Sequence, residues 1–227
     1  MTALARPAAA RKPRTAQGRT RTTAELLAQE YPGDGRSLCA LVHTDPFQLL
    51  VATILSAQCT DERVNLVTPS LFSRYPAPED LARAEPAELE EMIRPTGFFR
   101  SKTKSLIAMA AAVDEHHGGQ VPPEMEKLTE LPGVGRKTAN VVRSVAFGLP
   151  GLPVDTHVTR LSARLELSSA TDPEKIEAEL CRYLPRKEWG PLSLRLILHG
   201  RAVCTARKPA CRSCVLAWFC PSATVAG

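Results

Sequence analysis

The sequence predicts an all-α protein in which many short helices are joined by proline and glycine turns. Apolar side chains recur at helical spacing, as at positions 47, 50, 51, 54 and 55, which share one helix face. Sustained alternation of apolar and polar residues is absent, and no Asn-Gly pair marks a β-hairpin. The hydrophobic content of 44% is ordinary for a globular protein with a core.

Prolines mark the expected starts of three helices. Asp45-Pro46 places a capping carboxylate before a first-turn proline, and Asp172-Pro173 repeats this arrangement. Glu85-Pro86 opens a short helix that Gly97 is expected to close. A further helical stripe comprises Val154, Val158, Leu161 and Leu165.

One segment interrupts the helical pattern. Residues 149–153 have the sequence Leu-Pro-Gly-Leu-Pro, in which the prolines and the glycine disfavour a continuous helix. A chain of 227 residues has room for one large domain or two small ones. We therefore expect the chain to cross between two domains at this segment.

The positive charge of the chain is concentrated at its start. Lys and Arg outnumber Asp and Glu by 29 to 24, which gives a formal charge of +5. Residues 1–24 hold six of the cations and no acid, so the remainder has a net charge of −1. We expect residues 1–21 to form a disordered basic arm. The total charge is therefore no argument for nucleic-acid binding.

Charge is also segregated in the rest of the chain. Residues 79–91 hold six acids and one cation. Acid-free segments that contain four cations each follow at 92–113, which includes Lys102, and at 198–214. Such segments indicate a phosphate-binding face, although a solvated helix surface gives the same pattern. No apolar run approaches the roughly 18 residues of a membrane helix, so no membrane partner is expected.

Four of the seven cysteines lie close together near the end of the chain. The spacing C-x6-C-x2-C-x5-C joins Cys204, Cys211, Cys214 and Cys220. Zinc and iron–sulfur clusters both accept four thiolates. Because only one C-x2-C pair is present, we favour a structural [4Fe–4S] cluster over zinc. Crowded cysteines also favour a metal site in a reducing cytosol over a disulfide framework. Arg207 and Lys208 lie inside this loop, where they offset cluster charge, meet DNA phosphate, or do both.

A glycine-rich turn between two helical stretches is the second informative segment. Residues 131–139 have the sequence Leu-Pro-Gly-Val-Gly-Arg-Lys-Thr-Ala. The glycines permit a tight hairpin, whose central valine is expected to anchor the turn in the core. The amides of the hairpin and of the next helix N-terminus suit a DNA phosphate without reading sequence. We expect this interface to include Gly133, Val134, Gly135, Arg136 and Thr138.

Two residues are candidates for the chemistry. Lys137 lies at the start of the helix after the hairpin, where the helix dipole disfavours an ammonium, and partial burial would act in the same direction. A neutral lysine is a nucleophile that forms Schiff bases, whereas a charged one is a common phosphate contact. Asp155 precedes the stripe that starts at Val154, so it is either a helix N-cap or a catalytic carboxylate. A catalytic carboxylate there would stabilise a cationic sugar or accept a proton.

Five segments together resemble the endonuclease III family of the helix–hairpin–helix DNA glycosylase superfamily. They are residues 55–61, 131–142, 154–157 and 196–201 and the four-cysteine loop. The resemblance implies two helical domains that flank a DNA-binding cleft. A six-helix barrel with the helix–hairpin–helix would span residues 39–149. Residues 22–38 would join residues 150–227 in an iron–sulfur cluster domain.

The resemblance also implies an enzyme of base-excision repair. It would be a DNA glycosylase and abasic-site lyase that removes oxidised pyrimidines from duplex DNA and cleaves the strand on the 3′ side by β-elimination. Lys137 matches the Schiff-base lysine of the family and Asp155 matches its essential carboxylate. The expected partner is duplex DNA that holds damaged bases or abasic sites. The protein is expected to be a monomer in the bacterial cytoplasm, associated with the nucleoid through DNA.

Three further residues match DNA contacts of the family by position. Gln58 matches a residue that fills the gap left by the flipped nucleotide, with a capped helix end as the alternative. Phe98 occupies the position of a wedge that we expect to be leucine in relatives, with a core aromatic as the alternative. His157 resembles a phosphate contact, and a buried structural histidine is the alternative.

Three other functions are compatible with parts of the sequence. A monofunctional mismatch or adenine glycosylase of the same superfamily shares the hairpin and the cysteines but usually lacks the lysine at position 137. A non-catalytic DNA-binding module would use the hairpin alone, which leaves Asp155 and Gln58 without a shared purpose. A zinc-binding structural protein would be colourless and would hold zinc instead of iron.

Overall fold

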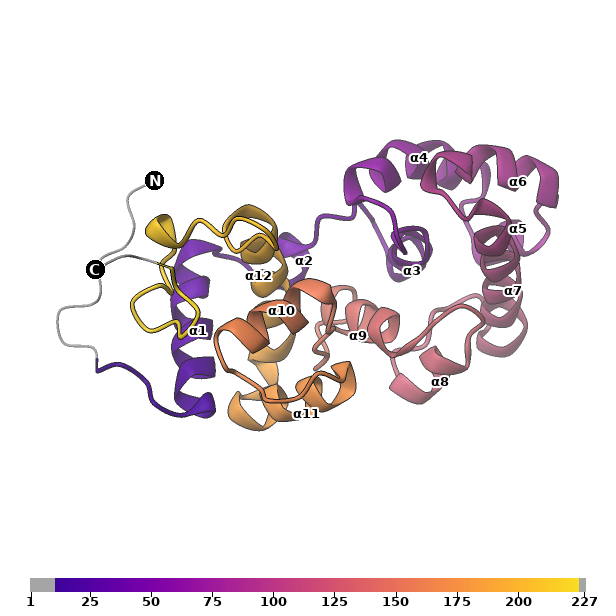
Figure 1. Cartoon of the computed structure of the whole chain (residues 1–227). Helices are drawn as coiled ribbons and strands as arrows, with labels where there is room; N and C mark the ends of the chain where they lie inside the picture. The colour runs from indigo at the N-terminus through magenta and orange to yellow at the C-terminus, as the bar shows by residue number, and fades with distance from the viewer. Residues whose placement is uncertain (1–10, 225–227) are drawn as a thin grey trace. The chain divides into compact units, whose positions relative to one another are not determined.

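The computed structural model describes residues 11–224, which form helices and loops without a β-strand (Figure 1). The predicted all-α fold is confirmed. The chain divides into two compact units, of which one is residues 39–149 and the other joins the chain up to Leu38 with the chain from Pro150. The second boundary lies inside the proline-rich segment at 149–153. Over the described range, no helix is long and apolar enough to cross a membrane.

Helix α3 (Pro46–Leu55) is the buried centre of the 39–149 unit. Asp45 caps it by accepting a hydrogen bond from the Gln48 N–H at 2.9 Å, and Pro46 lies in its first turn, as predicted. Eight of its ten residues are buried. The helices that contact it are α4 (Asp61–Arg74), α7 (Phe99–His117) and α9 (Arg136–Val145).

Shorter helices complete this unit: α5 (Pro78–Ala82), α6 (Pro86–Ile93), η1 (Arg94–Thr96) and α8 (Met125–Glu130). Helix α6 begins at Pro86 as predicted but ends at Ile93, earlier than Gly97. Pro95 has no N–H to continue the helical ladder, so the chain tightens into η1 before Gly97 turns with a φ of 70°. The shortest α-helix of this unit is α5, with five residues.

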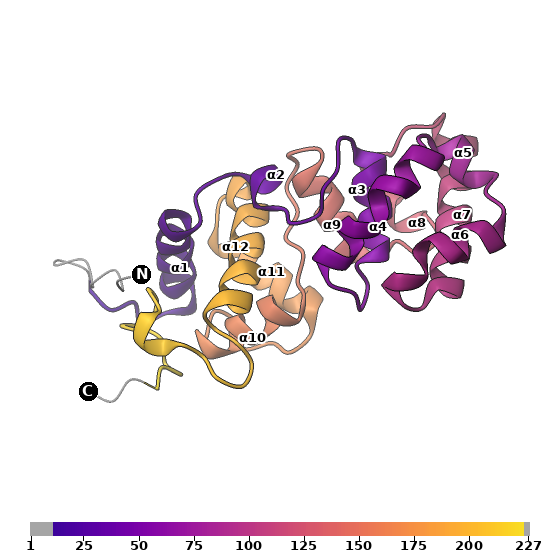
Figure 2. The ribbon, with the colours of Figure 1, turned by 90° about the horizontal axis from the view of Figure 1, so that it is seen from above.

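The second unit combines the start and the end of the chain. Its elements are α1 (Ala16–Glu30), α2 (Gly35–Leu38), α10 (Thr156–Arg164), α11 (Pro173–Tyr183), η2 (Arg186–Glu188), α12 (Trp189–Ala202) and η3 (Cys211–Ser213). Helix α12 lies between α1 and α10 in both views (Figures 1 and 2).

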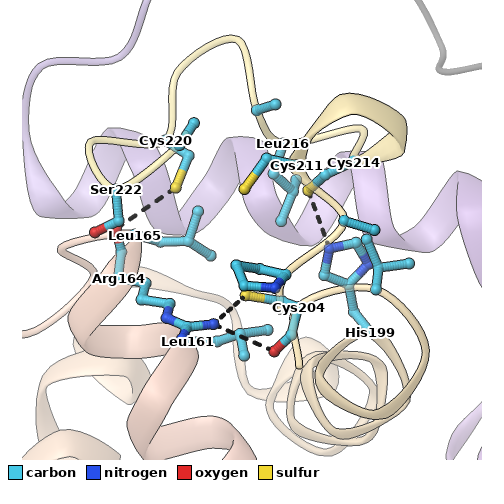
Figure 3. A pocket seen from close by; sticks show the side chains of 15 residues that line it. Leu161, Arg164, Leu165, His199, Cys204, Cys211, Cys214, Leu216, Cys220 and Ser222 are labelled. Carbon is cyan, nitrogen blue, oxygen red and sulfur yellow. Dashed lines mark hydrogen bonds between the residues drawn. The ribbon is translucent and has the colours of Figure 1, made fainter. Parts of the chain in front are cut away.

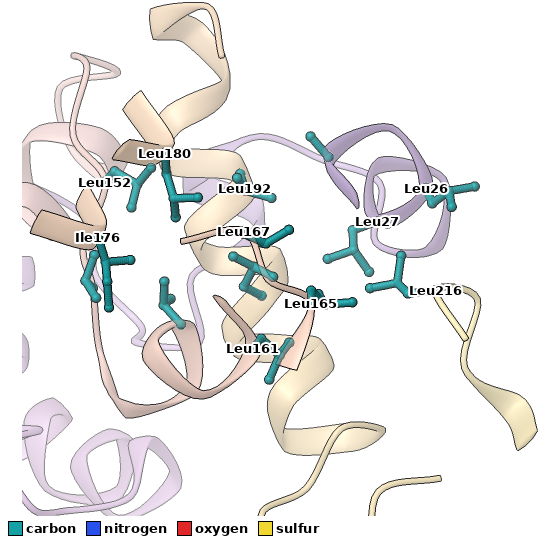
Figure 4. Packing of buried hydrophobic residues seen from close by; sticks show 14 of the residues in the cluster. Leu26, Leu27, Leu152, Leu161, Leu165, Leu167, Ile176, Leu180, Leu192 and Leu216 are labelled. Carbon is teal, nitrogen blue, oxygen red and sulfur yellow. The ribbon is translucent and has the colours of Figure 1, made fainter. Parts of the chain in front are cut away.

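One hydrophobic core joins these distant segments (Figure 4). Leucines from α1, α10, α11, α12 and the C-terminal loop are at most 1% exposed in it, namely Leu27, Leu161, Leu180, Leu192 and Leu216. The sequence around the cysteines is therefore held against the first helix of the chain.

Part of the segment expected to form a disordered basic arm, residues 1–21, is helical. Helix α1 begins at Ala16, and the Thr15 hydroxyl accepts a hydrogen bond from the Gly18 N–H at 3.1 Å. The Arg19 guanidinium donates two hydrogen bonds to the Glu166 carbonyl at 3.1 and 2.9 Å. These bonds reach a residue distant in sequence, so charge composition gave no sign of them. The first ten residues of the expected arm lie outside the described residues.

The basic segment at 92–113 contains one cation that does not face solvent. Lys102 on α7 is 5% exposed, and its Nζ donates to the carbonyls of Leu55 and Thr96, both at 2.8 Å. Burial lowers the pKa of this ammonium. The expectation of a phosphate-facing segment is therefore wrong for Lys102, whereas Arg100 and Lys104 are exposed.

Candidate functional site

The turn between α8 and α9 is the predicted hairpin. Gly133 has a φ of 76°, and a Cβ there would lie 2.7 Å from the Ser105 Cβ of α7. Val134 is 5% exposed, and its N–H donates to the Leu131 carbonyl at 3.1 Å. The hairpin is thus anchored by a buried valine and pressed closely against α7. Because the Val134 amide is already bonded, it is not an open donor for a phosphate.

Helix α9 begins with donors that no side chain caps. Gly135 is its N-cap residue, and the first turn contains no acid. A Cβ at Gly135 would meet nothing within 4 Å, so the approach to these amides is open. Uncapped first-turn amides at the positive end of a helix attract anions. Arg136 is exposed and Thr138 is half-buried in the same turn.

Lys137 is exposed in the first turn of α9. The partial burial that was considered for it is not found. Its environment is instead the positive end of a helix next to an open set of amide donors. This arrangement presents a primary amine beside a site that suits a DNA phosphate.

Asp155 is the N-cap residue of α10. Its Oδ1 accepts hydrogen bonds from the N–H groups of His157 and Val158 at 2.8 and 2.9 Å. Within the described part of the chain, Oδ2 accepts no hydrogen bond. The structural role that we considered for this carboxylate is therefore present, and it uses one oxygen only.

His157, in the first turn of α10, is packed tightly against Gly200 of α12. A Cβ at Gly200 would lie 2.9 Å from His157 Nδ1, so a side chain at position 200 would displace the ring. Burial lowers the pKa of His157, and the charges of Arg160 and Arg201 act in the same direction while that of Asp155 opposes them. Arg160 Nη2 lies 3.1 Å from Nδ1. The same Nη2 donates to the carbonyls of Gly200 and Cys204 at 2.9 and 3.1 Å, so Arg160 ties the His157 region of α10 to the end of α12.

Gln58 and Phe98 are both exposed and both have left-handed backbones. Their φ angles are 54° and 49°, and Phe98 is 65% exposed. The alternative interpretation of Phe98 as a core aromatic is therefore wrong. An exposed phenylalanine at the end of a loop is available to stack on a base.

The four clustered cysteines line one pocket, together with His199 and leucines of the core (Figure 3). All seven cysteines of the chain are described, and none forms a disulfide. Burial raises the pKa of the Cys214 thiol to about 11 and also raises that of Cys220. Thiols in such surroundings become thiolates when a cation stabilises them.

Two side chains outside the cysteine motif lie within hydrogen-bond distance of the sulfurs. Arg164 Nη1 lies 3.2 Å from Cys204 Sγ and donates to the Thr205 carbonyl at 2.8 Å. His199 Nε2 lies 3.2 Å from Cys214 Sγ, while Nδ1 lies 3.2 Å from the Tyr31 hydroxyl. Arg207 and Lys208 are exposed in the same loop. The donor set of four sulfurs with basic and N–H neighbours fits an anionic metal–thiolate centre.

Comparison with known proteins identifies the family. A family model described as HhH-GPD superfamily base excision DNA repair protein matches residues 51–186. An endonuclease III of Synechocystis is 55% identical over 199 residues, which covers 87% of this chain and 90% of the relative. The chain belongs to this superfamily.

Two solved structures of this HhH-GPD superfamily are similar to the chain over most of its length. A non-covalent endonuclease III–DNA complex has a TM-score of 0.86 at 41% identity and covers 92% of this chain and 97% of its own. A trapped endonuclease III–DNA covalent intermediate has a TM-score of 0.86 at 42% identity with the same coverage. The chain is a DNA glycosylase of base-excision repair, as the resemblance implied.

The sequence does not predict the contacts of three residues of this HhH-GPD protein. Each of them contacts an atom that is distant in the sequence. Arg164 and Lys102 donate to the backbone carbonyls of Thr205 and Leu55. His199 contacts the Cys214 sulfur. Any residue type presents a carbonyl, so no pattern of side chains marks such a partner. The position of His199 inside the matching segment 196–201 was the one available signal.

Proposed function

We propose that this glycosylase is also an abasic-site lyase, with Lys137 as its nucleophile. The observation that carries the proposal is the exposed amine of Lys137 in the first turn of α9, beside uncapped amides that suit a DNA phosphate. A phosphate held at these amides would bring the neighbouring sugar within reach of the amine. The similarity to an endonuclease III for which a covalent DNA intermediate has been trapped supports the same chemistry.

The substrate is duplex DNA with an oxidised pyrimidine. The damaged nucleotide leaves the stack, because a base inside a duplex cannot be reached for chemistry. Phe98 and Gln58, both exposed on loops of the 39–149 unit, occupy the space that the nucleotide vacates. Arg136, Thr138, His157, Arg207 and Lys208 contact phosphates, which position the duplex without reading its sequence.

The glycosylase step forms one bond and breaks one. The Lys137 amine, deprotonated at Nζ, attacks C1′ of the flipped nucleotide while the C1′–N bond to the base breaks, and the departing base takes up a proton. The transition state carries positive charge on the sugar. The Asp155 carboxylate stabilises this charge, and its Oδ2 is the oxygen that the N-cap does not use.

The lyase step follows from the product of the first. After Nζ has lost one proton, its lone pair forms a double bond to C1′ while the C1′–O4′ bond of the sugar ring breaks and O4′ takes up a proton. The hydrogen that remains on Nζ makes the resulting Schiff base cationic. The cationic Schiff base acidifies the C2′ proton, whose removal breaks the C3′–O bond and cleaves the strand on the 3′ side. Water then hydrolyses the Schiff base and restores the amine. Neither step requires an oxidant or a reductant.

We also propose that the four cysteines hold a [4Fe–4S] cluster. Cys204, Cys211, Cys214 and Cys220 would ligate it, with Arg164 and His199 donating to two of the sulfurs. The cysteine spacing, which contains only one C-x2-C pair, favours a cluster, in which each thiolate binds its own iron, over zinc. When bound, the cluster would cross-link the loop from 203 to 224. We propose that the protein acts as a monomer in the cytoplasm, at the nucleoid.

Borohydride trapping on abasic-site DNA tests the proposed function. The intact protein should form a covalent complex that is absent with Lys137→Gln. Lys127→Gln is the matched control, because Lys127 is an exposed lysine on α8 that pairs with Glu124 at 3.1 Å. Base release without trapping would show a monofunctional glycosylase instead. Zinc in place of iron in the purified protein would overturn the cluster assignment.

A further inference from the structure

The buried ammonium of Lys102 donates hydrogen bonds to the starts of two loops of the 39–149 unit, the loop that carries Gln58 and the loop that carries Phe98. Lys102 Nζ donates to the carbonyl of Leu55, the last residue of α3, and to that of Thr96, the last residue of η1, both at 2.8 Å. With 5% of Lys102 exposed, water does not replace these bonds. A buried ammonium is tolerated only where its hydrogen bonds are made. The side chain therefore holds the two carbonyls at a fixed separation.

Each carbonyl lies just before a residue with a left-handed backbone. Gln58 follows Leu55 by three residues and has a φ of 54°, and Phe98 follows Thr96 by two and has a φ of 49°. The Phe98 carbonyl accepts the first backbone hydrogen bond of α7, from the Lys102 N–H at 3.0 Å, so Phe98 is also fixed at the start of the helix that carries Lys102. Across the described chain, Glu166 alone shares this backbone region among the other non-glycine residues. Such conformations persist where the surroundings hold them, and they concentrate at functional sites.

We propose that Lys102 is a positioning residue that sets the spacing and orientation of Gln58 and Phe98 as they enter the DNA. Its side chain acts through the carbonyls of Leu55 and Thr96 and does not touch the substrate. An apolar side chain of similar length would fill the same space but would leave the carbonyls unbonded and the two loops uncoupled. The inference rests on the proposed function. It assigns Lys102 to nucleotide extrusion and not to the Schiff-base chemistry.

The test separates extrusion from chemistry by the choice of substrate. Lys102→Met keeps the length of the side chain and removes its donors. Excision of 5-hydroxyuracil from duplex DNA should fall about tenfold or more, because small displacements of positioning groups have large effects on rate. Trapping on a single-stranded abasic oligonucleotide, which has no base to extrude, should stay within about twofold of the unaltered protein. When 2-aminopurine is placed opposite the lesion, its fluorescence should rise as the unaltered protein extrudes the damaged nucleotide. Lys102→Met should not produce this rise.

Two controls on the same helix separate positioning from loss of stability. Thr103→Val removes a buried hydroxyl that has no hydrogen-bond partner, so both substrates should be processed normally. Met109→Ala removes a fully buried side chain that contacts neither loop carbonyl through a hydrogen bond. At a matched thermal midpoint, Met109→Ala should retain duplex excision where Lys102→Met loses it. If Lys102→Met does not fold, Lys102→Gln is the second variant, because its shorter side chain keeps donors but does not reach both carbonyls. It should likewise lose duplex excision and retain trapping on the single-stranded abasic oligonucleotide.

A double-mutant cycle tests whether Lys102 acts through the two exposed side chains. In a Gln58→Ala/Phe98→Ala background, Lys102→Met should lower duplex excision by no more than about twofold. An undiminished effect in that background, equal losses on both substrates, or normal duplex excision by Lys102→Met would each overturn the proposal. Failure of the unaltered protein to trap duplex abasic DNA would instead overturn the proposed function.

Discussion

The two carboxylate oxygens of Asp155 have different roles, one in capping α10 and the other in the proposed chemistry. Oδ1 holds the first turn of α10 through the N–H groups of His157 and Val158. Asparagine caps a helix about as well as aspartate, because its amide oxygen accepts the same bonds. The structural role therefore needs an oxygen, whereas stabilisation of a cationic sugar needs the charge.

We predict that Asp155→Asn separates these two roles. Its rate of base release should fall about 100-fold or more, since it lacks the carboxylate charge. Its free energy of unfolding should stay within about 0.5 kcal/mol of the unaltered protein, since the cap is retained. Single-turnover kinetics and thermal unfolding measure the two quantities.

Asp155→Ala is the matched comparison, because it removes both the charge and the cap. It should lose activity to the same degree and should also lose about 1 kcal/mol of stability. An Asp155→Asn variant with normal base release would show that the carboxylate serves the fold alone.

Single residues differ in how far the sequence predicts them. Lys137 and Asp155 lie in short segments whose composition points to a helix start, so their placement could be predicted. Lys102 was assigned to a basic surface, because a buried lysine and an exposed one look alike in sequence. Its partners are carbonyls of Leu55 and Thr96, which carry no side-chain signal.

At the scale of elements, the hairpin between α8 and α9 is built from two glycines with different tasks. Gly133 has a left-handed backbone and no room for a Cβ, because Ser105 lies 2.7 Å from that point. Gly135 has an ordinary φ of −88° and open space around it. One glycine therefore serves packing, and the other leaves the amides of α9 accessible.

We predict that alanine at these two positions separates stability from DNA binding. Gly133→Ala should lose about 2–4 kcal/mol of unfolding free energy, from backbone strain and from overlap with Ser105. Gly135→Ala should stay within about 0.5 kcal/mol, but its added methyl should weaken DNA affinity about tenfold by obstructing the amides. Chemical denaturation and titration with labelled duplex DNA give the two quantities. Equal losses of stability would contradict the assignment.

Helix starts were more predictable than helix ends. Asp45, Pro46 and Pro173 marked first turns correctly, because capping and proline geometry are local properties. Helix α6 ended before Gly97, and α1 started inside the expected arm. Near the start of α1, Arg19 donates to the Glu166 carbonyl, a contact with a distant residue that the sequence does not reveal.

At the scale of the molecule, each unit has its own means of stability. The 39–149 unit surrounds the buried helix α3. The other unit gathers α1, three later helices and the C-terminal loop around one core. The loop after α12 contains no α-helix through residue 224, so its order depends on a few core contacts and on its cysteines.

We predict that removal of iron exposes this loop and spares the 39–149 unit. Trypsin should then cleave after Arg207 and Arg212, while residues 39–149 stay protected, because the thiolates are no longer cross-linked through a metal centre. Mass spectrometry of limited digests before and after chelation measures this. Equal resistance in both forms would show that the loop does not depend on a metal.

Arg164 should control how long the iron is retained. Arg164→Met loses the donor to Cys204 Sγ and those to the Thr205 and Ala206 carbonyls, so iron should be released roughly tenfold faster. Arg212→Met is the control, because Arg212 is exposed in the same loop. Loss of visible absorbance with time measures the release, and equal rates would contradict this role of Arg164.

The most direct test of the central claim is the site of covalent attachment to DNA. The borohydride-trapped complex should be digested with trypsin and nuclease, and the modified peptide should be identified by mass spectrometry. Trypsin cleaves after Arg136 but not after a modified lysine, so the adduct should appear on the peptide 137–143, attached to Lys137. An adduct on another lysine or on the terminal amine would contradict the assignment of Lys137 as the nucleophile.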